Sequence, residues 1–214
     1  MSRPVLSRLT TPLLVSMACA VVSLILFAKL AEEMLEGEMR QFDDAVRQFV
    51  HFHSSARLTA AMRFFTILGS SLVVSIAATS GCAALWVAGR RRRALLLAIT
   101  VLGGSLLMWV LKVSFHRDRP QPFFDTHLPA SYSFPSGHAL LSLCLCGAGA
   151  ALLTAGQMKR WVRIVLWTFA AVLVLAIGYS RIYLGVHYPS DVLAGYLAAL
   201  VWVLGVEITY RKVR

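Results

Sequence analysis

The amino-acid sequence predicts an all-α, polytopic membrane protein in which six transmembrane helices form a bundle. Hydrophobic residues make up 58% of the 214 residues and charged residues 14%, compared with about 25% charged residues in soluble domains. The mean hydropathy is +0.70, and long apolar runs alternate with short basic segments. The length suits one domain over residues 1–214. We attribute the net charge of +11 to contact with membrane lipids, and we expect no nucleic-acid partner.

Six segments are long and apolar enough to cross a bilayer, which requires about 20 mainly apolar residues. They cover residues 12–31, 64–88, 94–111, 139–155, 164–180 and 190–207. The first follows Arg3 and Arg8, as the apolar part of a signal peptide would. Its apolar run is long, however, and Lys29 with Leu30 makes a poor cleavage site. We therefore expect an uncleaved span.

The segment between the first two spans, residues 32–61, has a different character. It is acidic at first, and Phe42, Val46, Phe49 and Val50 then recur at helical spacing. This pattern predicts an amphipathic helix lying on the outer membrane surface. The segment is either a connector between two spans or a wall that guides a lipid substrate to its site.

The remaining spans are supported by their composition and by the residues that flank them. The second contains no charged residue, and the third follows the basic run from Arg90 to Arg93. The fourth begins with the last residue of "FPSGHA" at residues 134–139, whose Pro, Ser and Gly suit a turn that opens a helix. The sixth is the weakest, because Asp191 lies near its start and Glu207 near its end. All four cysteines lie in apolar stretches, so we expect neither a disulfide framework nor a zinc site.

Basic segments predict the orientation, because cytoplasmic loops carry an excess of Lys and Arg. Four segments contain Lys and Arg but no acidic residue: the N-terminus and residues 90–93, 159–163 and 211–214. With six spans, these four segments share one side of the membrane. We therefore expect a multi-pass protein of the cytoplasmic membrane, with both termini in the cytoplasm.

Unusual polar residues collect in three places along the chain. They are Lys112 and Arg119 after the third span; Ser136, Gly137 and His138 before the fourth; and Arg181, His187 and Asp191 between the fifth and sixth. Odd spans end outside and even spans begin outside. All three clusters therefore reach the extracytoplasmic face, and charged residues at a membrane edge are usually functional.

These residue types suit phosphoryl transfer. Lys and Arg offer positive charge and hydrogen-bond donors but no acceptor, as a phosphate requires. Ser136 suits a helix cap, and Gly137 lets the backbone approach an anion at the helix N-terminus. His187 and Asp191 are four residues apart, so the carboxylate can hold one imidazole nitrogen and leave the other as nucleophile. This inventory predicts a phosphohistidine intermediate and requires neither a metal ion nor another cofactor.

The spacing of the three clusters resembles the type 2 phosphatidic acid phosphatase family, whose superfamily also contains vanadium haloperoxidases and bacterial acid phosphatases. The matching motifs are Lys112 with six residues before Arg119-Pro120, then Pro135-Ser136-Gly137-His138, then Ser180-Arg181 with five residues before His187 and three before Asp191. They lie in order within a core of about residues 94–207. The six spans resemble the membrane branch of the family, whereas the haloperoxidase branch is soluble.

The resemblance implies a role for each matched residue. Three would be catalytic: His187 as nucleophile, Asp191 as the group that orients it, and His138 as proton donor to the leaving group. Five would bind the substrate phosphate, namely Lys112, Arg119, Ser136, Gly137 and Arg181. Arg117 and Asp118 occupy variable positions of the first motif, and we expect them to pair with each other.

The expected function is a metal-independent lipid phosphate phosphatase that acts on outer-leaflet lipids, since the tail of such a substrate stays in the bilayer. Undecaprenyl diphosphate is the first substrate we expect, followed by phosphatidylglycerol phosphate and phosphatidic acid. The alternatives are a lipid phosphotransferase or a lipid A 1-phosphatase with the same site and, more remotely, an anion channel or transporter. The expected partners are the lipid phosphate substrate and membrane lipids; the sequence does not determine the oligomeric state.

Overall fold

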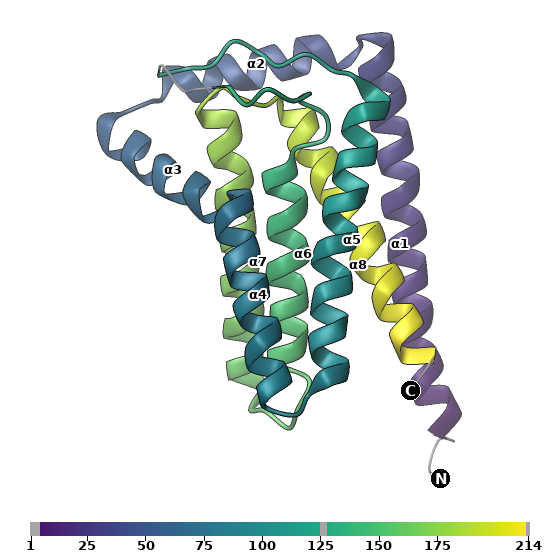
Figure 1. Ribbon diagram of the computed structural model, residues 1–214. Coiled ribbons are helices and arrows are strands. Elements are labelled where there is room, and N and C mark those ends of the chain that lie inside the picture. Colours follow the sequence, from purple (N-terminus) through teal and green to yellow (C-terminus); the bar gives the residue numbers. More distant parts are fainter. Residues whose placement is uncertain (1–4, 125–127, 213–214) are drawn as a thin grey trace.

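The computed structural model describes residues 5–124 and 128–212 of the chain, and these residues form eight α-helices with no strand among them (Figure 1). The helices are α1 (Val5–Glu36), α2 (Met39–Phe52), α3 (Ala56–Leu68), α4 (Ser71–Val87), α5 (Arg91–Phe115), α6 (Gly137–Leu153), α7 (Arg160–Tyr183) and α8 (Pro189–Lys212). The all-α prediction is thus confirmed. Arg3 and residues 213–214, which belong to the basic segments used to predict the orientation, lie outside the described residues.

The long helices run side by side, and α6 lies among them in contact with α5, α7 and α8 (Figure 1). Helix α1 packs along the outer side of α8, and α2 lies across one end of the bundle. The largest buried apolar cluster joins α4, α5, α6 and α8 through side chains such as Val74, Val101, Leu140 and Ala198. Packing around α6 therefore positions the helix that begins with the "SGH" sequence.

Four helices are long and apolar enough to cross a membrane: α1 from Leu13, α5, α7 and α8. Helices α3 and α4 together form a fifth, bent candidate. Helix α6 is apolar but has 17 residues, fewer than the roughly 20 that span a bilayer unaided. The structure therefore supports a membrane protein, and the count of six spans stays a prediction.

The second predicted span, residues 64–88, is wrong as a single helix. The apolar run is divided between α3 and α4, whose axes differ by 48°. Ser70 has an extended backbone and its Oγ accepts from the Val73 N–H at 3.3 Å, so a new helix begins there. A Cβ on Gly69 would lie 2.3 Å from Ile177 Cγ2 and 3.0 Å from His138 Cδ2. Hydropathy could not reveal this break, because the apolar run continues without a charged residue from Phe64 to Ala88.

The segment 32–61 forms parts of three helices: the end of α1, the whole of α2 and the start of α3. The amphipathic character of α2 is present in part, since Val50 is buried and Phe49 is 66% exposed. Asp43 departs from the expected pattern, because this carboxylate is fully buried beneath α2. A buried charge requires a partner, and the partner of Asp43 lies in the candidate site.

Close contact between α6 and α8 yields a first prediction. A Cβ on Gly195 would lie 2.7 Å from the Ser136 carbonyl oxygen and 3.0 Å from Ala139 Cβ. Gly195→Ala should therefore cost about 1–3 kcal/mol through overpacking, which lowers the midpoint of thermal unfolding by about 2–4 °C for each kcal/mol. The midpoint is measured by differential scanning fluorimetry of the protein in detergent.

The matched control is Gly205→Ala on the same helix, where an added Cβ meets no atom of the described residues within 4 Å. It should unfold at or slightly above the wild-type temperature, because alanine favours a helix. Equal midpoints for the two variants would show that α6 and α8 are not in the close contact described above.

Candidate active site

The three predicted clusters meet at the end of the bundle that α2 crosses (Figure 1). The first comes from the last turn of α5 and the loop that follows, the second from the start of α6, and the third from the end of α7 and the turn into α8. The structure therefore brings all eight predicted residues to one region. Their spacing along the chain allowed this arrangement, and the packing of α5, α7 and α8 around α6 produces it.

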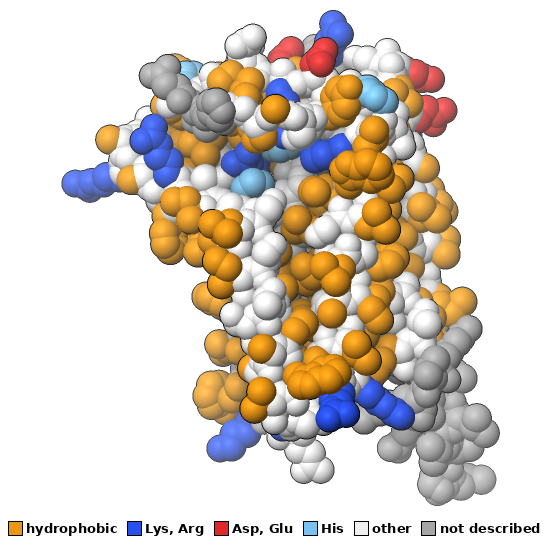
Figure 2. Space-filling view, in the orientation of Figure 1, with side chains coloured by type: hydrophobic (Ala, Val, Ile, Leu, Met, Phe, Trp, Pro, Cys, Tyr) orange, Lys and Arg blue, Asp and Glu red, His pale blue; other side chains and the backbone are white. Residues whose placement is uncertain are grey.

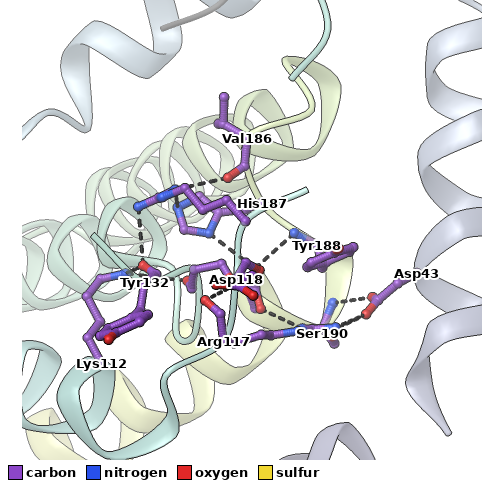
Figure 3. Close-up of polar contacts among 12 residues, drawn as sticks. Asp43, Lys112, Arg117, Asp118, Tyr132, Val186, His187, Tyr188 and Ser190 are labelled. Carbon is purple, nitrogen blue, oxygen red and sulfur yellow. Dashed lines mark hydrogen bonds and ion pairs between the residues drawn. The ribbon is translucent and has the colours of Figure 1, made fainter. Parts of the chain in front are cut away.

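His187 and Asp191 form the predicted pair, with His187 Nδ1 at 3.3 Å from Asp191 Oδ2. The His187 side chain is 2% exposed and that of Asp191 fully buried. Asp191 lies in the first turn of α8, where the helix dipole favours a carboxylate. Its Oδ2 also accepts from the Tyr188 N–H at 2.9 Å. The short turn between the two helices, which contains His187 and Tyr188 (Figure 3), thus holds both side chains in place.

Arg119 determines which nitrogen of His187 carries the proton. Arg119 Nη1 lies 3.1 Å from His187 Nε2, and a guanidinium can only donate hydrogen bonds. Nε2 therefore bears the lone pair, and Nδ1–H donates to Asp191. Burial lowers the pKa of His187 well below its usual range, and the charges of Arg181, Arg119 and Lys112 lower it further. At neutral pH the imidazole is uncharged, with a nucleophilic nitrogen among cations.

Backbone carbonyl oxygens of the α5–α6 loop and of the α7–α8 turn hold the first two cations. Arg119 Nε donates to the Ser131 carbonyl at 2.7 Å, and Arg119 Nη1 donates to the Val186 carbonyl at 3.0 Å. Lys112 Nζ donates to the carbonyl of Tyr132. These neutral acceptors orient the two side chains but leave their charges without a carboxylate of their own. An anion entering the site would meet two preorganised cations.

Ser136 takes the N-cap position of α6, but the prediction that its side chain caps the helix is wrong. The hydroxyl makes no cap hydrogen bond; it is buried and has no partner among the residues that the structure describes. Its backbone N–H donates to the Asp191 carbonyl at 2.9 Å, which joins the starts of α6 and α8. Gly137 packs against α5, since a Cβ there would lie 2.5 Å from Met108 Sδ. The hydroxyl is therefore free to bind a ligand.

Arg181 is the third cation and comes from the last turn of α7. It is 6% exposed, and its Nη1 donates to Thr66 Oγ1. Its Nε has no partner in the described part of the chain. His138 hydrogen-bonds to the backbone of the same Thr66. A buried unsatisfied donor calls for an explanation, and a phosphate oxygen would supply it.

Sequence reasoning missed Thr66, because nothing in an apolar run marks one threonine as a partner of an arginine 115 positions away. It also missed Asp43. The expected pairing of Arg117 with Asp118 is wrong: Arg117 Nη1 donates to Asp191 Oδ1 at 2.6 Å, and Nη2 donates to Asp43 Oδ2 at 2.7 Å. One signal was available, since Asp43 shares the apolar face of α2 with Val46 and Val50.

A hollow opens beneath the α2 end of the molecule, and His, Lys and Arg side chains lie within it (Figure 2). Hydrophobic side chains cover the bundle below this hollow. A pocket of about 350 Å³ adjoins the site and is lined by Arg117, Asp118, Arg119, Ala130, Ser131 and Tyr132. The described residues contain no group of three or more His, Cys, Asp or Glu side chains placed to hold a metal ion.

The bundle is helical and suited to a membrane, and its buried, neutral histidine lies among three cations that can donate hydrogen bonds to a phosphate. This combination is typical of an integral-membrane phosphate-ester hydrolase. Residues 93–214 match the PAP2 superfamily. The chain belongs to this superfamily, as its three motifs predicted.

Comparisons with individual proteins agree with this membership. The chain is 30% identical over 190 residues to the undecaprenyl-diphosphatase of Sulfolobus acidocaldarius, a match that covers 85% of this chain and 82% of the relative. It is 37% identical over 111 residues to phosphatidylglycerophosphatase B of Bacillus subtilis, which covers 49% of this chain and 52% of the relative.

Among solved structures, the fold is similar to a transmembrane PAP2-type phosphatidylglycerolphosphate phosphatase from Bacillus subtilis. The TM-score is 0.84 at 26% sequence identity, over 91% of this chain and 97% of that one. The likeness therefore extends over most of the chain and well beyond the part that carries the three motifs.

The free hydroxyl of Ser136 yields a second prediction. Ser136→Ala removes no hydrogen bond made within the described residues, so the ligand-free protein should unfold at the wild-type temperature. Affinity for inorganic phosphate should fall about fivefold, because one hydrogen bond of about 1 kcal/mol is lost. The affinity is measured from the phosphate dependence of thermal unfolding.

The control is Ser142→Ala in the same helix, whose buried hydroxyl donates to the Ala139 carbonyl at 3.1 Å. Its phosphate affinity should match that of the wild type. Wild-type phosphate affinity in Ser136→Ala would remove this hydroxyl from the site.

Proposed function

We propose that this protein removes phosphate from membrane lipids at the extracytoplasmic face of the cytoplasmic membrane, with undecaprenyl diphosphate as its first substrate. The observation that carries the proposal is the placement of three cations, Lys112, Arg119 and Arg181, around a neutral, buried His187. The free Ser136 hydroxyl at the start of α6 supports it. The similarity to an undecaprenyl-diphosphatase over 85% of the chain supports a diphosphate lipid. Phosphatidylglycerol phosphate and phosphatidic acid are the next substrates to test.

In the first half of the proposed reaction, His187 Nε2 attacks phosphorus while Lys112, Arg119 and Arg181 hold the phosphate oxygens. The bond between phosphorus and the leaving oxygen breaks, and His138 gives that oxygen a proton. Asp191 accepts from Nδ1–H of His187 and stabilises the positive charge that the phosphorylated imidazole carries. The product of this half is a phosphohistidine and a free lipid hydroxyl or lipid monophosphate.

In the second half, water attacks the phosphohistidine and gives a proton to the now neutral His138, so that inorganic phosphate leaves and both imidazoles return to their starting forms. Burial and the charge of Arg181 oppose protonation of His138 in the ligand-free protein. A bound phosphate compensates that charge. His138 therefore takes up a proton when the anionic substrate binds, gives it to the leaving oxygen, regains one from water and releases it when inorganic phosphate leaves.

The position of the site suits a substrate that remains partly in the bilayer. The hollow lies at the end of an apolar bundle, above hydrophobic side chains (Figure 2). Phe49 of α2 and Phe64 of α3 are 66% and 58% exposed beside this end, and aromatic side chains favour the membrane interface. We propose that α2 and α3 form a wall along which the lipid reaches the site, in a protein whose termini are both cytoplasmic.

The test of this function is phosphate release from a panel of purified lipids in detergent. His187→Ala should lower the rate by at least about 10⁴-fold, since the nucleophile is lost. The control is His53→Ala, which should release phosphate normally, because the exposed ring that follows α2 hydrogen-bonds to the Phe49 carbonyl and to no other group of the described residues. Full activity of His187→Ala would refute the mechanism.

The same assay with a labelled lipid distinguishes a phosphatase from a phosphotransferase. A phosphotransferase would pass the labelled phosphate to an acceptor other than water.

The role of His138 can be tested by its dependence on the leaving group. Phosphatidic acid loses a poor leaving group, an alkoxide, whereas p-nitrophenyl phosphate loses a stable phenolate. His138→Ala should slow release from phosphatidic acid by about 10²–10⁴-fold and slow release from p-nitrophenyl phosphate far less. Equal losses on the two substrates would show that His138 is not the proton donor.

A further inference from the structure

Arg117 connects the catalytic pair to a helix that carries none of the three motifs. Its Nη1 donates to Asp191 Oδ1 at 2.6 Å, and its Nη2 donates to Asp43 Oδ2 at 2.7 Å. Asp43 belongs to α2, 74 positions before Arg117, and reaches the start of α8 from the side (Figure 3). It also accepts from the backbone N–H of Ser190 at 2.9 Å and from its hydroxyl at 2.6 Å.

This arrangement balances charge in a buried place. Both carboxylates are fully buried, and the Arg117 side chain is 14% exposed. Its guanidinium also lies 4.1 Å from the centre of the Tyr188 ring, in a favourable cation–π contact. Burial alone would lower the pKa of Arg117, but Asp191 and Asp43 raise it above its ordinary value. One firmly charged cation therefore serves two carboxylates.

Sharing this cation determines how Asp191 faces His187. Asp191 uses Oδ1 for Arg117, which leaves Oδ2 for the Tyr188 N–H and for His187. Arginine otherwise tends to bind both oxygens of a carboxylate with two parallel hydrogen bonds. Asp43 prevents this by occupying Nη2. Without its charge, the guanidinium would act on Asp191 alone, weaken it as an acceptor and draw Oδ2 away from His187.

We propose that Asp43 and Arg117 are positioning residues that hold the Asp191 carboxylate against His187 and thereby make helix α2 part of the catalytic apparatus. This inference rests on the proposed function, because it assigns the pair to the phosphatase reaction. Neither residue touches the reacting phosphate. They act through Asp191, so their loss should impair the transition state more than the binding of substrate.

The test is Asp43→Asn, which keeps the size of the side chain and removes its charge. We expect kcat for phosphate release to fall about tenfold with KM nearly unchanged. The inhibition constant of vanadate, which mimics the transition state at phosphorus, should rise by the same factor. A merely structural defect would reduce the amount of active protein and leave both KM and the vanadate constant as in the wild type.

The adjacent Asp44 provides a matched control, because its side chain is 55% exposed and its ion pair, with Arg47, is a long one of 3.7 Å. Asp44→Asn should have wild-type kcat and vanadate inhibition. Equal kinetics for Asp43→Asn and Asp44→Asn would overturn the inference. If the wild type itself released no phosphate from any lipid, the proposed function would fall and this inference with it.

A double-mutant cycle tests whether Asp43 acts through Arg117. On an Arg117→Gln background, Asp43→Asn should change kcat by less than about twofold, because the guanidinium that it orients is absent. If the kcat of the double variant fell by the product of the two single-variant factors, Asp43 would not act through Arg117. Ser190→Ala is a milder second variant that retains every charge and removes only the hydroxyl between Arg117 and Asp43. It should shift kcat and vanadate inhibition together, by a smaller factor than Asp43→Asn.

Discussion

Asp191 lies fully buried in the first turn of α8 and is held by hydrogen bonds from three other segments of the chain. Its carboxylate accepts from Arg117 and from the Tyr188 N–H and faces His187, while its carbonyl accepts from the N–H of Ser136 at the start of α6. A buried carboxylate is stable only when such donors surround it, so the carboxylate of Asp191 requires Arg117 and the turn of His187 and Tyr188 to meet, while its backbone carbonyl joins the start of α6 to α8. The positions of these segments relative to one another therefore depend on the hydrogen bonds made to Asp191.

The charges around His187 then account for the chemistry. Lys112, Arg119 and Arg181 converge on the imidazole, and Asp191 is already shared with Arg117. Carbonyl oxygens hold Lys112 and Arg119 without neutralising them. Such a cluster is costly in apolar surroundings, and a phosphate offsets that cost while gaining preorganised donors. A site of this kind has an excess of positive charge, and a bound phosphate would neutralise that excess.

Two features could not be predicted from the sequence: the buried contact that helix α2 makes and the bend between α3 and α4. The residue types of the three motifs, and the spans around α5, α7 and α8, followed from spacing and hydropathy. The break at Gly69 did not, because it arises where Ile177 and His138 press against the backbone. The amphipathic pattern of α2 indicated a surface helix but gave no reason to expect a buried Asp43 bonded to Arg117.

The sequence by itself determined the membrane class, the family and the eight residues that meet at the site, because hydropathy and motif spacing are local properties. Only the tertiary structure decided which partners orient those side chains. Thr66 bonds to Arg181 across 115 positions and Asp43 to Arg117 across 74, and such contacts depend on how whole helices pack. A carboxylate on an amphipathic helix is equally compatible with solvent and with a buried ion pair until the fold places a cation beside it.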